Sequence, residues 1–241
     1  MRIYSSVREA VKEIERDMFE MGIDNHAPTV QDLDVRDNSD YDSKELISYG
    51  YIIRDFTDID KIFEFFFKSE EADRVKMYCQ KELLERMSLK PKNPGVAWVY
   101  RKEYWDKFIH GGKFSYTYSE RMHDQFDKVL SELKNAPGSR QCLITIYDKH
   151  NDIDKLGGKE RIPCSLYYHF MRRKVSGEDV LFMVYSMRSC DFYTHFPIDV
   201  WLAIEFGRMV ATICGSKLIS FTHFISSLHA FRKDYKERRI F

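Results

Sequence analysis

The chain has 241 residues, and its 38 Lys and Arg balance its 38 Asp and Glu, so the formal net charge is zero. A chain of this charge has no general attraction to nucleic acid or to acidic membranes, and we expect neither as a partner. Hydrophobic residues make up 44% of the chain and aromatic residues 15%, enough for a sizeable core. Only 11 Gly and 6 Pro exclude a fibrous or low-complexity protein.

The cysteine pattern predicts a reducing compartment. The chain has five cysteines, an odd number, and none are spaced as C-x-x-C: Cys79, Cys142, Cys164, Cys190 and Cys214. This pattern argues against a disulfide framework and against a cysteine-based zinc site, so we expect no metal. The charged N-terminus does not fit a signal peptide, and no apolar run approaches the ~18 residues of a membrane span. We therefore expect a cytoplasmic protein, in the host cytoplasm if a phage encodes it.

Periodicity predicts helices in much of the first half. Ser6 and Glu9 fit a capping box, and Gly22 ends the apolar repeat that follows. The acidic stretch 24–43 is expected to be a mobile loop. In strand 46–53, Gly50 indicates a bulge or a close approach of another backbone or side chain. The elements expected here are helices at 7–21, 59–67 and 72–87, a strand at 46–53, an irregular stretch at 88–118, and a helix that ends at 136–138.

The second half is rich in β-branched and aromatic residues. Strands are expected at 142–147, 164–173, 180–188 and 217–231, with a hairpin turn at 176–178 and a buried helix at 198–214. No repeat and no domain-boundary linker interrupts the chain. The pattern predicts one α+β domain over residues 1–241, in which helices pack against a mixed sheet.

Four short motifs carry reactive or charged groups, and each alone has an ordinary structural explanation. Cys164 follows Pro163 at the start of a strand, where a small buried side chain is common. The run Arg188-Ser189-Cys190-Asp191 ends a strand and resembles a surface turn as much as a phosphate site. Asp199 fits a helix-capping carboxylate, and His229 fits a strand histidine.

The order and spacing of these motifs resemble the thymidylate synthase family. The segment DQFDKVLSELKNAPGSR at 124–140 resembles a helix of that family and the Pro-x-Ser-Arg turn after it. The segment YCQKEL at 78–83 resembles the stretch around the active-site glutamate of the phage deoxycytidylate hydroxymethylases. The resemblance covers roughly residues 44–231. It implies a thymidylate synthase-like fold, a homodimer formed through the sheet, and 5,10-methylenetetrahydrofolate as the one-carbon donor.

The resemblance also implies a role for each matched residue. A cysteine thiolate adds to C6 of a pyrimidine nucleotide, so that C5 becomes nucleophilic and attacks the methylene group of the folate. The implied assignments are Cys164 as nucleophile, Glu82 as proton relay with Glu85 as its substitute, Arg188 and Ser189 as phosphate ligands, Arg140 as a phosphate ligand of the partner subunit, Asp191 as pterin ligand, and His229 as sugar ligand.

Two departures from the family pattern affect the nucleotide site. The family has two adjacent arginines where this chain has Arg140 and Gln141, so Arg36 or Lys44 is a candidate for the missing phosphate contact. Phe231 stands where the family has Tyr, which removes one hydroxyl contact to the sugar. Ribose and deoxyribose substrates therefore both stay open.

Asp199 indicates the base. It aligns with the Asn of the uracil-specific synthases, and the cytosine-specific phage hydroxymethylases have Asp there. A carboxylate accepts from the N4 amino group of cytosine, and from N3 once N3 is protonated, but it faces O4 of uracil acceptor to acceptor. We therefore expect a cytidine nucleotide, dCMP or CMP, as substrate.

Two further features favour hydroxymethylation over methylation. Ser165 stands where the synthases have His, and only ten residues follow Phe231, so no counterpart of the tail that closes over folate is recognisable. A less sealed site favours addition of water over hydride transfer. The alternatives are a 5-methyl-cytidylate or thymidylate synthase, and a catalytically silent family member that binds a nucleotide or a protein partner.

Overall fold

The computed structural model describes residues 1–30, 33–157 and 161–241. In this part of the chain, seven strands form one mixed sheet. Six of them follow the order β1-β5-β9-β8-β7-β6, and the seventh, β2, pairs with the N-terminal end of β5. The β1–β5 and β8–β9 pairs are parallel, and the others are antiparallel. The strands of this sheet are β1 (Arg2–Tyr4), β2 (Ile23–Asn25), β5 (Ser43–Ile53), β6 (Leu143–Thr145), β7 (Ser165–Val175), β8 (Glu178–Asp191) and β9 (Lys217–Phe231).

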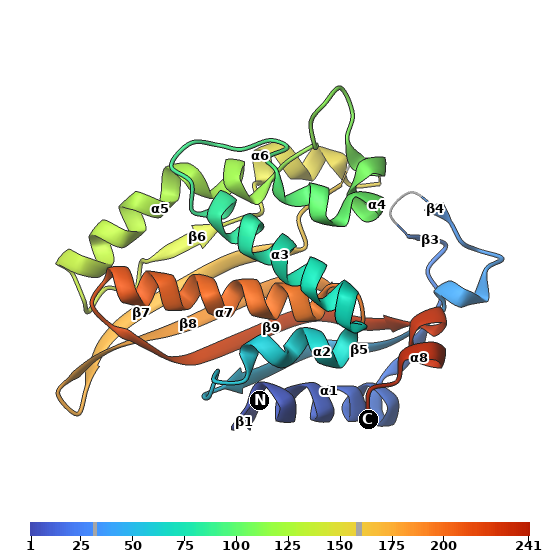
Figure 1. Cartoon of the computed structure of the whole chain (residues 1–241), viewed down its shortest axis with the longest axis horizontal. Coiled ribbons are helices and arrows are strands. Elements are labelled where there is room, and N and C mark those ends of the chain that lie inside the picture. The colour runs from blue at the N-terminus through green and yellow to red at the C-terminus, as the bar shows by residue number, and fades with distance from the viewer. Residues whose placement is uncertain (31–32, 158–160) are drawn as a thin grey trace.

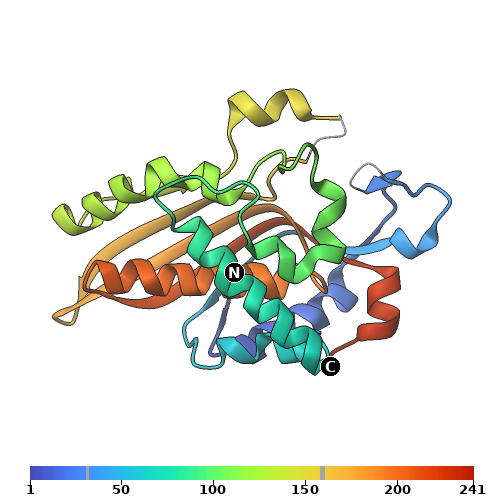
Figure 2. The ribbon, with the colours of Figure 1, turned by 45° about the horizontal axis from the view of Figure 1, so that its top comes forward.

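Helices pack against this sheet, which confirms the predicted α+β class. Figure 1 shows α2, α3, α5 and α7 on the viewer's side of the strands, and after the turn of Figure 2 the long strands still pass behind α7. The helices are α1 (Val7–Met21), α2 (Ile62–Phe66), α3 (Ser69–Arg86), α4 (Lys102–Trp105), α5 (Tyr118–Asn135), α6 (Lys149–Asp152), α7 (Phe196–Ile213) and α8 (Arg232–Arg238), with a 3-10 turn η3 at Ala97–Arg101.

Local sequence signals explain several of these elements. Ser6 caps α1 by accepting a hydrogen bond from the Glu9 amide at 3.1 Å, which is one half of the predicted capping box. The other half differs, because the Glu9 carboxylate accepts from the amide of Ser5 at 2.7 Å instead of that of Ser6. The turn between β7 and β8 has φ of 51° at Ser176 and 88° at Gly177, the two left-handed residues of a tight hairpin. At Gly50, a Cβ atom would lie 2.8 Å from the Phe224 ring, so of the two explanations for this glycine the close approach is confirmed.

Several short elements were not expected from the sequence. Strand β1 and helix α8 have too few residues for a visible hydrophobic period. Segment 24–43, expected to be a mobile loop, contributes β2 to the sheet, and it also holds the separate pair β3 (Thr29–Val30) and β4 (Leu33–Asp34). Residues 31–32 lie outside the described part of the chain.

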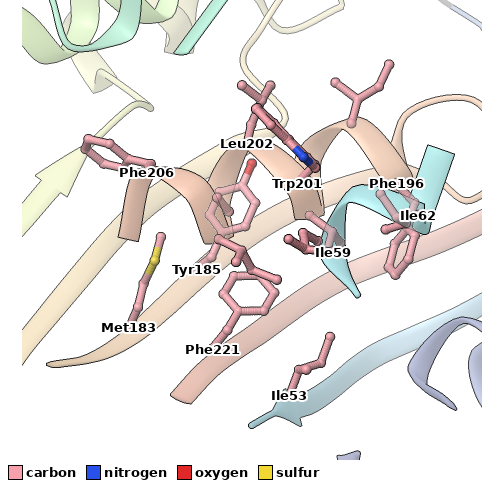
Figure 3. Packing of buried hydrophobic residues seen from close by; sticks show 14 of the residues in the cluster. Ile53, Ile59, Ile62, Met183, Tyr185, Phe196, Trp201, Leu202, Phe206 and Phe221 are labelled. Carbon is pink, nitrogen blue, oxygen red and sulfur yellow. The ribbon is translucent and has the colours of Figure 1, made fainter. Parts of the chain in front are cut away.

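The core lies between α7 and the sheet. In Figure 3, Met183, Tyr185 and Phe221 project from the strands toward α7. Phe196 and Phe206 of that helix are buried, which agrees with the buried helix predicted from its apolar sequence. Among the described residues, no helix is long and apolar enough to cross a membrane.

The opposite sheet face is less covered. Phe224 on β9 is 42% exposed and lies opposite Gly50 of β5 and Ser186 of β8. Its neighbours along this face include Thr222 and Val184, which pair with one another and are only partly buried. An apolar sheet face of this kind is typical of a surface that pairs with a partner.

Several chain segments converge at one end of the sheet. The C-terminal ends of β8 and β9 lie side by side there, with Asp191 opposite His229. The N-terminal end of β7 lies beside them, because Ser165 pairs with Met187 of β8. Helix α7 begins five residues after β8 ends, so its first turn also lies at this end. The topology thereby gathers the motifs that are far apart in the sequence.

Candidate active site

Cys164 lies directly before β7, and Arg188 of β8 holds it in place. The Arg188 amide donates to the Cys164 carbonyl oxygen at 2.8 Å. Its Nε and Nη2 atoms each donate at 2.9 Å to the carbonyl oxygens of Pro163 and Ile162, and Nη2 also lies 3.8 Å from Cys164 Sγ. Burial raises the pKa of the Cys164 thiol, and the positive charge of Arg188 counteracts that rise. The arrangement suits a thiol that must form a thiolate.

Asp199 lies in the first turn of α7, against Cys190 of β8. The Cys190 thiol donates to Asp199 Oδ2 at 3.7 Å. Burial raises the pKa of Asp199 to about 7, while the guanidinium of Arg86 counteracts the rise. Asp199 also lies close enough to Cys164 to raise the pKa of that thiol. The carboxyl group is therefore near the thiol and is poised between its neutral and ionised forms around neutral pH.

Glu82 lies on α3 and faces the same region. Its side chain is 16% exposed, and Oε1 accepts from Arg86 Nε one helical turn later at 2.8 Å. The charge of Glu82 contributes to the rise in the pKa of Asp199, which places the two carboxyl groups near one another. Glu85, the substitute candidate, instead accepts from the backbone amides of Val96 and Ala97. Glu85 thus anchors the start of η3, and of the two only Glu82 belongs to the candidate site.

Ser165 directly follows the thiol and is bonded within a cluster of tyrosines. The residue is fully buried, and its hydroxyl bonds to Tyr118 at 2.8 Å and to Tyr185. The charge of Asp199 raises the pKa of both of these tyrosines, so the cluster lies close to the candidate site. The expectation that Ser165 favours access of water stays a prediction.

Asp191, His229 and Ser189 line the strand ends beside the thiol. Asp191 Oδ1 accepts from the amides of Tyr193 and Thr194 at 3.1 and 3.2 Å, which shapes the turn into α7. Burial raises the pKa of Asp234 on α8 to about 6, and the negative charge of Asp191 adds to this rise. The two carboxyl groups therefore lie near one another. Ser189 pairs with Ser227 along β8 and β9. The structure thus brings seven of the eight predicted site residues to one region, all except Arg140.

Arg140 lies in the exposed turn before β6, tied to the other face of the sheet. Its carbonyl oxygen accepts from Nε2 of His169 at 3.0 Å, and Arg173 Nη1 donates to the Ser139 carbonyl at 3.1 Å. His169 pairs with Val184, which in turn pairs with Thr222. The turn is therefore anchored to side chains of the less covered face, where a second subunit is predicted.

The two candidates for an additional phosphate contact both pair with carboxylates. Lys44 Nζ lies 2.8 Å from Asp24 Oδ1, and Arg36 Nε donates to Asp34 at 3.0 Å. Each pair is exposed and contributes little stability, so either cation remains available to a stronger anion. The choice between them stays a prediction.

Aromatic residues and a neutral histidine border the site on the η3 and α4 side. The guanidinium of Arg161 lies over the rings of Trp105 and Phe108, and its Cζ atom is 4.7 and 4.5 Å from their centroids. The Tyr104 hydroxyl lies 2.6 Å from His195 Nε2, and burial keeps the pKa of His195 well below its usual value. Sequence reasoning missed His195 and Arg86, because no periodic or motif signal distinguishes a ligand-facing side chain from a core one.

The residues present fit a pterin more than a metal ion. Within residues 1–30, 33–157 and 161–241, no group of three or more His, Cys, Asp and Glu side chains is placed to hold a metal. The indole Nε1 of Trp105 and the Nη1 of Arg101 are buried without a hydrogen-bond partner. Unpaired donors beside flat rings suit a flat heterocycle with carbonyl and ring-nitrogen acceptors.

Comparisons with protein families and with curated proteins both find thymidylate synthases. A family model described as thymidylate synthase matches residues 48–239. A thymidylate synthase of Streptococcus suis (strain 05ZYH33) is 27% identical over 142 residues, which are 57% of this chain and 50% of that protein. One from Streptococcus pneumoniae (strain ATCC 700669 / Spain 23F-1) is 26% identical over 172 residues, 64% of this chain and 61% of that protein. These alignments thus span about half to three fifths of the curated relatives.

A solved structure has the same fold. The thermostable thymidylate synthase A from Bacillus subtilis superposes with a TM-score of 0.69 over 97% of this chain and 83% of that chain, at 19% sequence identity. At this identity the likeness concerns the fold, and it confirms the predicted architecture. The choice of base, the choice of sugar and the nature of the product depend on individual side chains, which a likeness of fold does not determine.

Proposed function

Because the chain belongs to the thymidylate synthase family, a family of one-carbon transferases that use 5,10-methylenetetrahydrofolate, we propose that it hydroxymethylates C5 of a cytidine nucleotide, dCMP or CMP. The products are the 5-hydroxymethyl nucleotide and tetrahydrofolate, and water supplies the hydroxyl group. The observation that carries the proposal is the buried Asp199 carboxyl in the first turn of α7, which accepts from the Cys190 thiol and whose charge raises the pKa of the Cys164 thiol.

The first demand is a nucleophile for C6. Cys164 meets it, because Arg188 fixes the backbone on both sides of the thiol and its charge favours the thiolate. The bonds to Pro163 and Ile162 use Nε and Nη2 of Arg188. Nη1 and the Ser189 hydroxyl are then the groups of this strand end that we assign to the phosphate. His229 on the adjacent strand is assigned to the sugar.

The second demand is selection of the base. One oxygen of Asp199 accepts from the N4 amino group of cytosine, and one proton shared between the other oxygen and N3 completes a second hydrogen bond. A carboxyl group whose pKa is about 7 holds such a proton at little cost near neutral pH. With uracil, an ionised Asp199 places an acceptor against O4, which leaves a buried mismatch.

The third demand is control of protons and water at C5. Glu82 and Asp199 are ionisable groups close to the thiol, and Glu82 keeps part of its surface accessible. Charged groups retain water around them, which favours hydration of the one-carbon unit over hydride transfer. Glu82 then takes up the C5 proton through ordered water.

The one-carbon donor fits the aromatic border of the site. When bound, 5,10-methylenetetrahydrofolate supplies the electrophilic carbon that C5 attacks. Asp191 is the residue that we assign to its pterin ring, and the Trp105 Nε1 and Arg101 Nη1 atoms are buried donors without a hydrogen-bond partner. Asp234, whose pKa is about 6, lies close to Asp191 and offers a further acceptor.

A homodimer completes the proposal. The partly exposed face around Phe224 supports pairing of two sheets, and the turn that carries Arg140 is anchored to that face by His169. We assign Arg140 to the phosphate of the nucleotide bound by the partner subunit. Residues of both subunits then form each site.

Release of tritium tests the reaction. dCMP, CMP and dUMP tritiated at C5 are incubated with methylenetetrahydrofolate, with and without the protein. Release from dCMP or CMP that is lost in Cys164→Ala is the expected result, and the product mass identifies an added hydroxymethyl group. Lack of release from all three nucleotides would contradict the proposal, and would favour a silent nucleotide-binding protein.

A methyl-transferring synthase is the second candidate, because the curated relatives are named thymidylate synthases. The same tritium release occurs in that reaction, so it does not separate the two. Methyl transfer oxidises tetrahydrofolate to dihydrofolate, whereas hydroxymethylation leaves tetrahydrofolate. The increase in absorbance caused by dihydrofolate therefore identifies the synthase.

A further inference from the structure

Arg86 is a buried cation next to the candidate general base. Only 4% of its surface is exposed, and its Nε donates to Glu82 Oε1 at 2.8 Å. An unpaired guanidinium at this depth is strongly unfavourable, so the carboxylate and the cation hold each other in place. The pair therefore limits the positions that Glu82 can adopt on α3.

The other end of Arg86 reaches the sheet. Its Nη1 donates to the Tyr168 hydroxyl at 3.1 Å, and its Cζ lies 3.9 Å from the centroid of the Tyr118 ring. A planar guanidinium with a partner at each edge and a ring against its face has little freedom to turn. Arg86 is therefore a fixed link between α3, α5 and β7.

The tyrosines around Arg86 lead to the residue after the nucleophile. Tyr168 stacks on Tyr185, with centroids 4.6 Å apart and planes 10° apart. The hydroxyls of Tyr185 and Tyr118 both bond to Ser165, which follows Cys164. The contacts of Arg86 thus run from Glu82 to the strand that follows the thiol, through the buried Tyr168 and Tyr185 and the partly buried Tyr118.

We propose that Arg86 is a positioning residue of this active site, which holds the Glu82 carboxylate toward the reacting base and supplies a buried positive charge to the site. The inference rests on the proposed function, since it assigns Glu82 and Asp199 to the reaction. A purely structural role would be to join α3 to the sheet. The two roles differ in what happens to Asp199 and to the proton transfer when Arg86 is changed.

Arg86 is one of many charged and titratable groups that act on the pKa of Asp199. Among the described residues that influence the carboxyl group, Arg86 is the foremost cation that opposes the effect of burial, and Arg101 of η3 adds to it. Glu82 acts in the opposite direction. The remaining titratable groups that interact with Asp199 are Tyr51, Cys79, Tyr118, Cys164, Tyr168, Tyr185 and Cys190.

The test compares three variants of the full chain. Arg86→Met removes the charge and keeps the length, Arg86→Lys keeps the charge without the planar fork, and Arg121→Met breaks another ion pair. Arg121 is a matched control, because its Nη2 lies 2.6 Å from the fully buried carboxylate of Asp152, in a pair that we assign no role in the reaction. Circular dichroism verifies that each variant is folded.

Two measurements are made on each variant. The first is the ionisation midpoint of Asp199, followed by the carboxyl carbon signal in protein labelled with ¹³C-aspartate and assigned with Asp199→Asn. The second is the rate of tritium release from dCMP at saturating nucleotide, together with the Kd for dCMP. The first needs no activity, so it remains informative if the proposed function is wrong.

In Arg86→Met we expect the midpoint of Asp199 to rise by about one pH unit or more. Tritium release should fall by about 100-fold, while the Kd for dCMP changes by less than about 3-fold. Arg86→Lys should keep the Asp199 midpoint of wild type but release tritium more slowly than wild type. If Arg86→Met does not fold, Arg86→Lys is measured in its place. Arg121→Met should change neither quantity.

The inference is overturned if folded Arg86→Met keeps the midpoint and the release rate of wild type, or if it changes them only as Arg121→Met does. If wild type releases no tritium from any nucleotide, the proposed function fails. A shift of the Asp199 midpoint in Arg86→Met then still supports the electrostatic part of the inference, and an unchanged midpoint overturns it.

Discussion

The Nη2 atom of Arg188 lies 3.8 Å from Sγ of Cys164, while the same guanidinium bonds to the two carbonyl groups that precede the thiol. One side chain thus fixes the position of the nucleophile and provides a positive charge beside it. Arg188, which the family resemblance assigns to the phosphate, therefore also positions the Cys164 thiol.

Arg188→Leu should raise the pKa of the Cys164 thiol, because it removes the charge that opposes the effect of burial. At neutral pH we expect alkylation by iodoacetamide to be about 10-fold slower, as for a rise of about one pH unit. The measurement is the alkylation rate of Cys164 against pH, followed by mass spectrometry. Arg140→Leu is the control, and an unchanged profile in Arg188→Leu would contradict the electrostatic role.

Asp199→Asn should change the preferred base. The amide donates to O4 and accepts from N3–H of uracil, so we expect the ratio of kcat/KM for dCMP over dUMP to fall by about 100-fold or more. Competition between the two nucleotides in one tritium assay measures this ratio. Asp60→Asn is the matched control, because it alters a carboxyl that accepts from Trp201 of the same helix. A cytosine preference that survives in Asp199→Asn refutes the assignment.

The contribution of Asp199 to the stability of the fold should fall as the pH rises from about 4 to about 7. The pKa of Asp199 is raised from 3.8 to about 7, so the folded state keeps a proton that an unfolded chain loses in this range. The contribution of the protonated form is complete below about pH 4 and is lost above about pH 7, and it is worth no more than about 4 kcal/mol. Urea unfolding at pH 5 and pH 8 should show a smaller difference in Asp199→Asn than in wild type. Equal differences would argue against a raised pKa.

Ser165→Ala should reduce stability and leave the product unchanged. It removes the bonds that the Ser165 hydroxyl makes to Tyr118 and Tyr185 in the interior, which costs about 1–3 kcal/mol. Thermal unfolding measures the loss, and product mass shows whether the outcome differs. A change from the hydroxymethyl to the methyl product would mean that this position controls water.

Mixing two inactive variants tests the shared site. Cys164→Ala lacks the nucleophile, and Arg140→Leu lacks the phosphate ligand that we assign to the partner's site. After the subunits are exchanged, half of the dimers are mixed and each has one intact site, so we expect about a quarter of wild-type activity. Phe224→Asp, which places a charge on the exposed sheet face, should yield monomers in sedimentation and abolish the recovery. Recovery that is absent from the mixture would show that Arg140 acts within its own subunit, or not at all.

The sequence by itself determined the helices and strands with a clear period or composition, such as the periodic α1, the apolar α7 and the β-branched and aromatic β7–β8 hairpin, and the residues of a short motif such as Pro163-Cys164. These depend on local preferences and on neighbours in the chain, which a sequence displays directly. Only the tertiary structure decided which side chains face the site. It buried Ser165 among tyrosines, used Glu85 to anchor η3, and placed Arg86 between Glu82 and Tyr168. The reason is physical: burial and pairing depend on contacts between segments far apart in the chain, and such contacts leave no periodic signal in the sequence.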